Sequence, residues 1–114
     1  IFYQRPDQAG PKKSDISLYQ AEDLSGLLSV LEAALSVKVV VDKRRRIYFI
    51  DNVKFHLDQV DGLGSFVEIE AIDYEGKLGE KQLHRQVDEF KELLKISSED
   101  LLERSYSDIS CRYL

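Results

Sequence analysis

Three pairs of charged side chains, each pair separated by one residue, lie between residues 43 and 70: Lys43 with Arg45, His56 with Asp58, and Glu68 with Glu70. Alternate side chains of a β-strand point to the same face, so each pair would share a face of its strand. Carboxylates bind hard cations such as Mg²⁺ or Mn²⁺, and lysine and arginine bind phosphate oxygens. Gathered on one sheet, these residues would suit a metal-assisted polyphosphate site.

The sequence around these pairs predicts three antiparallel strands. Residues 37–50 are rich in β-branched and aromatic side chains, and Asp51-Asn52 suits a two-residue hairpin turn before a strand at 53–60. A five-residue loop at 61–65 then leads to a strand at 66–72. The predicted sheet is therefore a meander that carries all three charged pairs.

Turn geometry sets the register and divides the sheet into two faces. A turn at Asp51-Asn52 places Arg45 opposite Asp58, and the loop at 61–65 places Asp58 opposite Glu68 and His56 opposite Glu70. The apolar face comprises Tyr48, Ile50, Val53, Phe55, Leu57, Val67, Ile69 and Ala71. The charged face comprises Lys43, Arg45, His56, Asp58, Glu68 and Glu70. Opposed carboxylates favour a bound cation between them. The alternative is a solvated face, which is common when helices cover only the other side.

The flanking segments predict a hairpin and helices around this sheet. Residues 1–5 and 13–19 read as strands joined by a turn-rich loop, and apolar residues recur at helical spacing in 21–35 and 80–94. A short third helix is expected at 98–103, because a serine cap and early acidic residues begin it. The fold class is α+β, with amphipathic helices seated on an antiparallel sheet and one domain over residues 1–114.

Composition excludes several classes of partner. The net charge of −5 disfavours general binding to nucleic acid or anionic membranes, and no apolar run approaches the roughly 20 residues of a membrane span. The single cysteine, Cys111, fits a cytoplasmic setting. The chain begins at Ile1 inside a strand-like run and contains no methionine, so an N-terminally incomplete domain is expected.

Three ordered blocks resemble the CYTH domain of the triphosphate tunnel metalloenzymes: Lys43 to Tyr48, His56-Leu57-Asp58, and Gly62 to Glu70. The opening Tyr3 to Asp7, the segment Lys12 to Asp15 and the closing Arg104-Ser105-Tyr106 are similar too, so the resemblance covers nearly the whole chain. It implies an antiparallel β tunnel or barrel with charged residues inside and helices outside. The family's Glu-x-Glu-x-Lys strand is absent from this sequence, so the chain resembles the later part of the domain.

By this resemblance, each charged residue takes an expected role. Asp58, Glu68 and Glu70 would hold Mg²⁺ or Mn²⁺, and the triphosphate would be bound by Arg5, Lys13, Lys43, Arg45 and Arg104. The catalytic set would be Asp58, Glu68, Lys43 and Arg45. Lys13 is favoured over Lys12 as the inward lysine, and His56 and Tyr106 are given no defined role.

The resemblance implies hydrolysis of an organic or inorganic triphosphate, with ATP, thiamine triphosphate and tripolyphosphate as candidate ligands. Two alternatives remain open at this stage. One is a class IV type adenylate cyclase, which converts ATP to cyclic AMP and pyrophosphate. The other is a non-catalytic module that binds nucleotides or polyphosphate. A homodimer is also left open.

Overall fold

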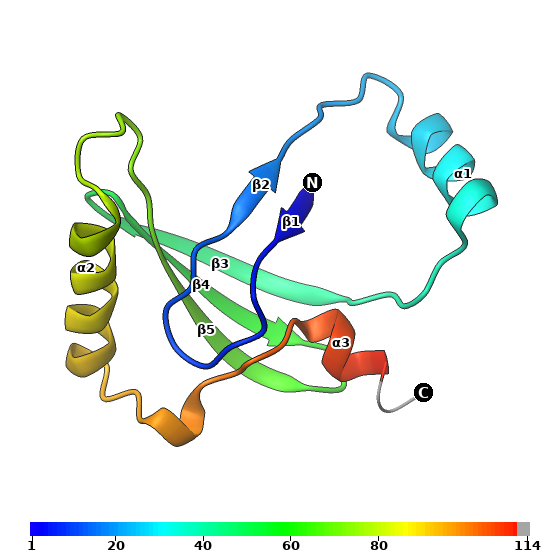
Figure 1. The fold of residues 1–114 in the computed structure, drawn as a ribbon. Helices are drawn as coiled ribbons and strands as arrows, with labels where there is room; N and C mark the ends of the chain where they lie inside the picture. Colours follow the sequence, from blue (N-terminus) through cyan, green and yellow to red (C-terminus); the bar gives the residue numbers. More distant parts are fainter. Residues whose placement is uncertain (112–114) are drawn as a thin grey trace.

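The computed structural model describes residues 1–111 and contains two separate antiparallel sheets with helices around them (Figure 1). The strands are β1 (Phe2–Gln4), β2 (Asp15–Ser17), β3 (Lys43–Ile50), β4 (Val53–Val60) and β5 (Gly64–Ala71). The helices are α1 (Leu24–Leu35), α2 (Glu80–Leu93), the 3₁₀ turn η1 (Ser98–Asp100) and α3 (Tyr106–Cys111). Strands β1 and β2 form a hairpin, and the larger sheet has the order β3-β4-β5. The α+β class is confirmed.

The first hairpin of the larger sheet has the predicted register. Ile50 lies opposite Val53, and Arg45 lies opposite Asp58. The turn is tight because Asp51 adopts a φ of 52°, a left-handed conformation that aspartate tolerates better than most residues. Strand β3 is shorter than predicted, since residues 37–42 are not in a strand.

The predicted register of the second hairpin is wrong by two residues. Val60 pairs with Gly64, so the connection contains only Asp61, Gly62 and Leu63 rather than residues 61–65. Gly62 and Gly64 have φ values of 77° and 108°, and this left-handed backbone makes the shorter turn possible. A shift of two preserves the faces, because side chains alternate with a period of two. The partners of the charged residues nevertheless change.

Helix α2 covers the apolar face of the sheet, as predicted. The rings of Phe55 and Phe90 meet edge to face, with centroids 4.9 Å apart, and Val53 beneath the helix is only 1% exposed. The Asn52 and Gln86 side-chain amides exchange two hydrogen bonds of 2.9 Å, and Asn52 also donates to the Ile72 carbonyl. The helix is thereby fixed to the hairpin turn as well as to the strands.

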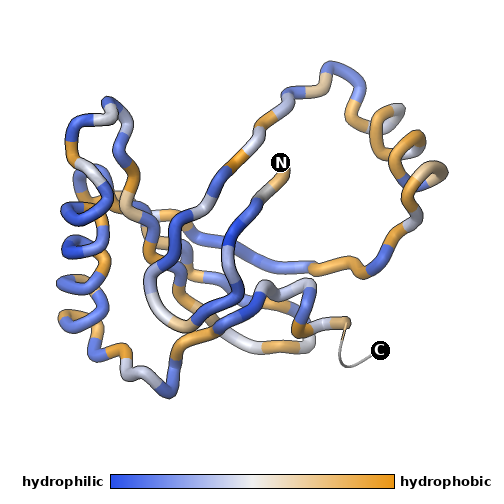
Figure 2. Tube along the Cα trace, viewed as in Figure 1, coloured by the Kyte–Doolittle hydropathy of each residue, from blue (hydrophilic) through white to orange (hydrophobic). Residues whose placement is uncertain are grey.

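Helix α1 begins later than predicted and is not seated on the sheet. Asp23 caps it by accepting a hydrogen bond of 2.9 Å from the Gly26 amide, so the helix starts at Leu24 rather than at residue 21. None of its residues is buried, and it lies apart from β3–β5 (Figure 1). Its residues are nevertheless mostly hydrophobic (Figure 2).

The C-terminal part differs from the predicted helix at 98–103. Ser97 and Asp100 form a capping box, but only the 3₁₀ turn η1 follows it. The chain then forms α3, which begins at Tyr106 and which the sequence pattern did not reveal. None of the helices in the described part of the chain is long and apolar enough to span a membrane.

Candidate functional site

The centre of the charged face is buried even though its residues are polar. Asp58 and His56 in β4 are 2% and 6% exposed, respectively. The loop between β1 and β2 and the C-terminal segment lie over this face, on the side away from α2 (Figure 1). Because buried ionisable groups need partners, the contacts of these two residues define the candidate site.

Arg45 is the central cation of the site. Its Nε and Nη2 donate to the two carboxylate oxygens of Asp58 at 2.7 and 2.6 Å, and Nη2 lies 3.4 Å from Glu68 Oε2. These hydrogen bonds from Arg45, with support from Tyr106 and Lys43, hold the pKa of Asp58 below its usual range although burial acts against this. The guanidinium therefore contacts both Asp58 and Glu68, although these two carboxylates do not lie opposite each other in the sheet.

Helix α3 contributes Tyr106 to the same site. Its hydroxyl donates a hydrogen bond of 3.0 Å to Asp58 Oδ2, and its ring packs against Phe66 with centroids 5.0 Å apart. Lys43 Nζ lies 5.1 Å from the centre of that ring and 3.8 Å from Asp58 Oδ2. Burial and the neighbouring Asp58 raise the pKa of Tyr106, so the phenol remains protonated beside the carboxylate.

The corrected register separates the carboxylates of β5 from Asp58. Glu68 lies opposite His56, whose Nδ1 is 3.2 Å from Glu68 Oε2, and Asp58 instead faces Phe66. Glu70 lies opposite Lys54 and forms an ion pair of 2.8 Å with it. The predictions that Asp58 faces Glu68 and that His56 faces Glu70 are therefore wrong.

The loop between β1 and β2 places its two lysines differently from the prediction. Lys12 is half-buried, and its Nζ donates to the Gln8 and Glu103 carbonyl oxygens at 2.9 and 3.0 Å. Burial, together with nearby Arg5, lowers the pKa of Lys12. Lys13 is exposed. The inward lysine is thus Lys12, and its hydrogen bond to the Glu103 carbonyl joins the loop to the C-terminal segment.

Two predicted phosphate ligands, Arg5 and Lys13, lie together at the small hairpin. With Gln4, Pro6 and Asp15 they line a depression of about 460 Å³ beside the small hairpin. Arg104 is exposed and takes part in no hydrogen bond or ion pair found within residues 1–111. The structure therefore brings together Lys43, Arg45, Asp58 and Glu68 but does not join Arg104 to them.

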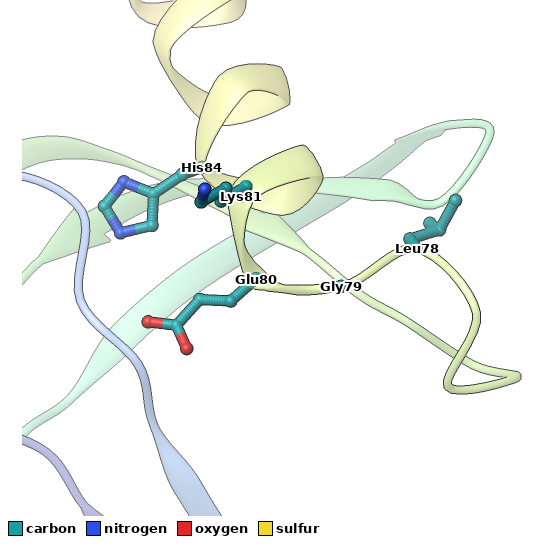
Figure 3. Close-up of a pocket in the computed structure, with 5 residues that line it drawn as sticks. All are labelled: Leu78, Gly79, Glu80, Lys81 and His84. Carbon is teal, nitrogen blue, oxygen red and sulfur yellow. The ribbon is translucent and has the colours of Figure 1, made fainter.

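A second depression, of about 640 Å³, lies at the beginning of α2 (Figure 3). Glu80, Lys81 and His84 line it together with Leu78 and Gly79. None of the predicted site residues lies there. It is separate from the charged face and provides no support for polyphosphate chemistry.

The carboxylates of Asp58, Glu68 and Glu70 have only some of their oxygens available to bind a divalent metal ion. Both oxygens of Asp58 are engaged by Arg45 and Tyr106, and Glu70 is paired with Lys54. The hydrogen bonds of Glu68 within residues 1–111 all end on Oε2. No three histidine, cysteine or acidic side chains gather as a metal site in that range. Glu68 and Glu70 are each engaged through Oε2 alone in the contacts found within residues 1–111, so each has Oε1 left for a metal.

The hydrogen bonds made by Lys12 and Tyr106 were not apparent in the sequence. The sequence does not separate Lys12 from Lys13 correctly, because the strand predicted from residue 13 begins only at Asp15 and both lysines lie in the loop before it. The sequence pattern predicted no helix at Tyr106, so its position beside Asp58 became apparent only with helix α3. The pairing of His56 with Glu68 could have been found, since a three-residue turn built on Gly62 and Gly64 predicts it.

Together these features define an α+β protein in which an antiparallel sheet carries an ion-pair network on one face and a helix on the other. The sequence profile of the CYTH domain matches residues 1–106, and the chain belongs to this family. CYTH domains have the triphosphate tunnel fold, bind triphosphates and generally depend on a metal ion.

Solved structures show the same fold. The PH1012 protein from Pyrococcus horikoshii OT3 superposes with a TM-score of 0.75 at 24% identity, over 85% of this chain and 57% of that one. A conserved hypothetical protein from Pyrococcus furiosus gives a TM-score of 0.72 at 20% identity, over 85% and 58% of the two chains. This chain thus spans slightly more than half the length of each. No curated protein matches its sequence.

Proposed function

We propose that the charged face binds the phosphates of a small triphosphate and that the protein hydrolyses this ligand with the help of Mg²⁺ or Mn²⁺. The observation that carries the proposal is the joining of Arg45 to Asp58 and Glu68, with Lys43 beside them. These residues come from adjacent strands, so a firmly hydrogen-bonded sheet holds their spacing. A fixed set of cations can stabilise phosphate charge without rearranging during the reaction.

Arg45 is oriented for this role by its partner. Asp58 takes the Nε and Nη2 hydrogens, so the remaining nitrogen, Nη1, is left to donate to a phosphate oxygen. Lys43 adds a second positive charge that is only loosely paired, at 3.8 Å from Asp58. Arg5 and Lys13 would hold a more distant phosphate from their own depression. Arg104 would contact the ligand only after its side chain turned toward this face.

A divalent ion would neutralise phosphate charge and make the phosphorus more susceptible to attack by water. Glu68 and Glu70 are the residues that we expect to hold it through their Oε1 atoms, with Asp58 joining only if Arg45 released it. The engagement of both Asp58 oxygens also supports a second candidate function, in which the face binds triphosphate without hydrolysing it.

The test is to incubate the purified chain with ATP, thiamine triphosphate and tripolyphosphate in Mg²⁺ or Mn²⁺ and to measure binding, orthophosphate and cyclic AMP. Orthophosphate release supports the hydrolase. Cyclic AMP and pyrophosphate without orthophosphate would contradict it and support a cyclase, and saturable binding without turnover would support the binding module. The variant Arg45→Gln should weaken binding at least tenfold. The control Arg85→Gln, which changes an exposed arginine of α2, should not.

A further inference from the structure

His56 lies on the charged face, and the proposed function leaves it without a role. Its side chain is only 8% exposed, and its Nδ1 lies 3.2 Å from Glu68 Oε2. A buried polar group needs a hydrogen-bond partner, because an unpaired one lowers the stability of the fold. Glu68 meets this need, so the two side chains form one unit within the sheet.

The chemistry of the two groups sets the direction of this hydrogen bond. An ionised carboxylate only accepts, so the shared proton lies on Nδ1 of the imidazole. An imidazole has a proton there in one of its two neutral tautomers and also when it is charged. Arg45 Nη2 approaches the same oxygen of Glu68 to 3.4 Å, so His56 is the nearer of its two donors.

The sheet fixes the distance over which this contact forms. His56 in β4 lies directly opposite Glu68 in β5. The Ile72 amide donates to the Asn52 carbonyl at 3.0 Å, and the alternation of an antiparallel ladder then places His56 and Glu68 among the pairs whose backbones bond each other. Both side chains therefore start from backbone positions that are held together.

The two side chains differ in how firmly the fold holds them. The imidazole of His56 is buried and has only two side-chain torsions, whereas the side chain of Glu68 is 41% exposed and has three. An exposed glutamate samples several rotamers, and a fixed donor reduces this freedom before any ligand binds. The buried ring is therefore the fixed member of the pair, and the carboxylate is the member that it orients.

We propose that His56 is a positioning residue for Glu68, whose free oxygen, Oε1, binds the divalent ion. The Nδ1–H group of His56 holds Oε2, so the carboxylate is oriented before the ion arrives. The proposal rests on the assignment of Glu68 to the metal in the proposed function. Groups that hydrogen-bond to a metal-binding side chain typically change metal affinity by about 10- to 100-fold.

A purely structural role for His56 makes a different prediction. The contact would then only stabilise the pairing of β4 with β5, and its loss would lower the resistance of the protein to unfolding. The metal affinity of the protein that remains folded would not change. Metal binding by folded variants, in the absence of triphosphate, therefore separates the two roles.

The measurement is the binding of Mn²⁺ to the purified protein, followed by electron paramagnetic resonance of the free ion. His56→Leu keeps a similar volume but removes the donor, and it should weaken Mn²⁺ binding at least tenfold. His56→Asn has an amide nitrogen the same number of bonds from the backbone as Nδ1, so it should restore the affinity to within about threefold of wild type. The matched control, His84→Leu, changes an exposed histidine of α2 and should leave the affinity unchanged (Figure 3).

A double variant tests whether His56 acts through Glu68. Glu68→Ala alone should weaken Mn²⁺ binding, and the addition of His56→Leu should cause no further loss beyond about twofold, because no carboxylate remains to be oriented. Circular dichroism checks that each variant is folded. If His56→Leu does not fold, long-range ¹H–¹⁵N NMR spectra of the wild-type protein decide. They should show a proton on Nδ1 of His56, and a proton on Nε2 alone would contradict the proposal.

Three binding results would overturn the proposal. They are equal Mn²⁺ affinity in wild type and folded His56→Leu, a loss from His56→Leu that persists in full beside Glu68→Ala, and no Mn²⁺ binding by the wild-type protein. The proposed function stands or falls separately. His56-dependent Mn²⁺ binding without any binding of tripolyphosphate would support this role and contradict that function. Hydrolysis of tripolyphosphate with Mn²⁺ binding that ignores His56 would do the reverse.

Discussion

At the scale of single residues, Arg45 and Asp58 control the electrostatics of the charged face. Asp58 is 2% exposed and receives hydrogen bonds on both oxygens, while Arg45 also reaches Glu68. A buried carboxylate without its cation is costly, but replacement of the whole pair by neutral groups is tolerated much better. The pair therefore orients a phosphate-binding group and at the same time stabilises the fold.

We expect Arg45→Gln to lower the free energy of unfolding by about 3 kcal/mol, because it leaves the Asp58 anion buried without its main partner. The double variant Arg45→Gln with Asp58→Asn should recover part of this loss, since no buried charge remains. Urea denaturation of the two single variants and the double variant measures the coupling. Additive losses in the double variant would show that the two side chains act independently.

Tyr106 should give a distinct alkaline titration. Its folded pKa is raised above the unfolded value near 10, so its contribution to stability is complete below that value and is lost as pH rises through the folded pKa. Tyrosinate absorbance should therefore include a late ionisation step, at a pH above that unfolded value. The late step should disappear in Tyr106→Phe. Its persistence would place the late tyrosine elsewhere.

At the scale of elements, the sheet is joined to α2 at two places. The Phe55 and Phe90 rings pack at the centre of the apolar face, and the amides of Asn52 and Gln86 bind each other at the hairpin turn. Helix α1 has no comparable attachment, because none of its residues is buried. The two amphipathic helices therefore differ in what they contribute to stability.

Substitution in the two helices should show this difference. Phe90→Ala should lower the unfolding free energy by about 3 kcal/mol through loss of packing. Leu28→Ala in α1 should change it by less than about 0.5 kcal/mol, because Leu28 is already exposed. Thermal and urea unfolding measure both. A large effect of Leu28→Ala would mean that α1 packs against the molecule in solution.

The amide pair at the turn can be tested separately. Asn52→Ala and Gln86→Ala should each cost about 1 kcal/mol, since each leaves the other amide with unmet hydrogen bonds. The double variant should cost less than the sum of the two. Strict additivity in denaturant unfolding would argue against the reciprocal hydrogen bonds.

At the scale of the whole molecule, the chain is more extended than its length requires. The radius of gyration is 16.1 Å, whereas a compact domain of this length has about 13 Å. Helix α1 and the β1–β2 hairpin project from the larger sheet (Figure 1). Many large apolar side chains consequently remain in contact with solvent, including those along β3.

Small-angle X-ray scattering can test this shape. The monomer should give a radius of gyration above the compact value, because α1 lies apart from β3–β5. A measurement near the compact value, obtained at several concentrations to exclude association, would mean that α1 folds back onto the sheet.

The sequence by itself determined the two faces of the sheet and the pairing of Arg45 with Asp58. Strand alternation and the Asp51-Asn52 turn depend only on local chemistry, so they can be read from neighbouring residues. The CYTH family was also recognised from the sequence, and the profile match over residues 1–106 confirms it.

The tertiary structure decided which partners the charged residues have. The left-handed glycines at 62 and 64 shortened one turn by two residues and placed Glu68 beside His56 and Glu70 beside Lys54. The contacts of Tyr106 with Asp58 and of Lys12 with the Glu103 carbonyl join residues 48 and 91 positions apart in the chain. Local propensity carries no information about such distant contacts, because they form only when separate elements pack together.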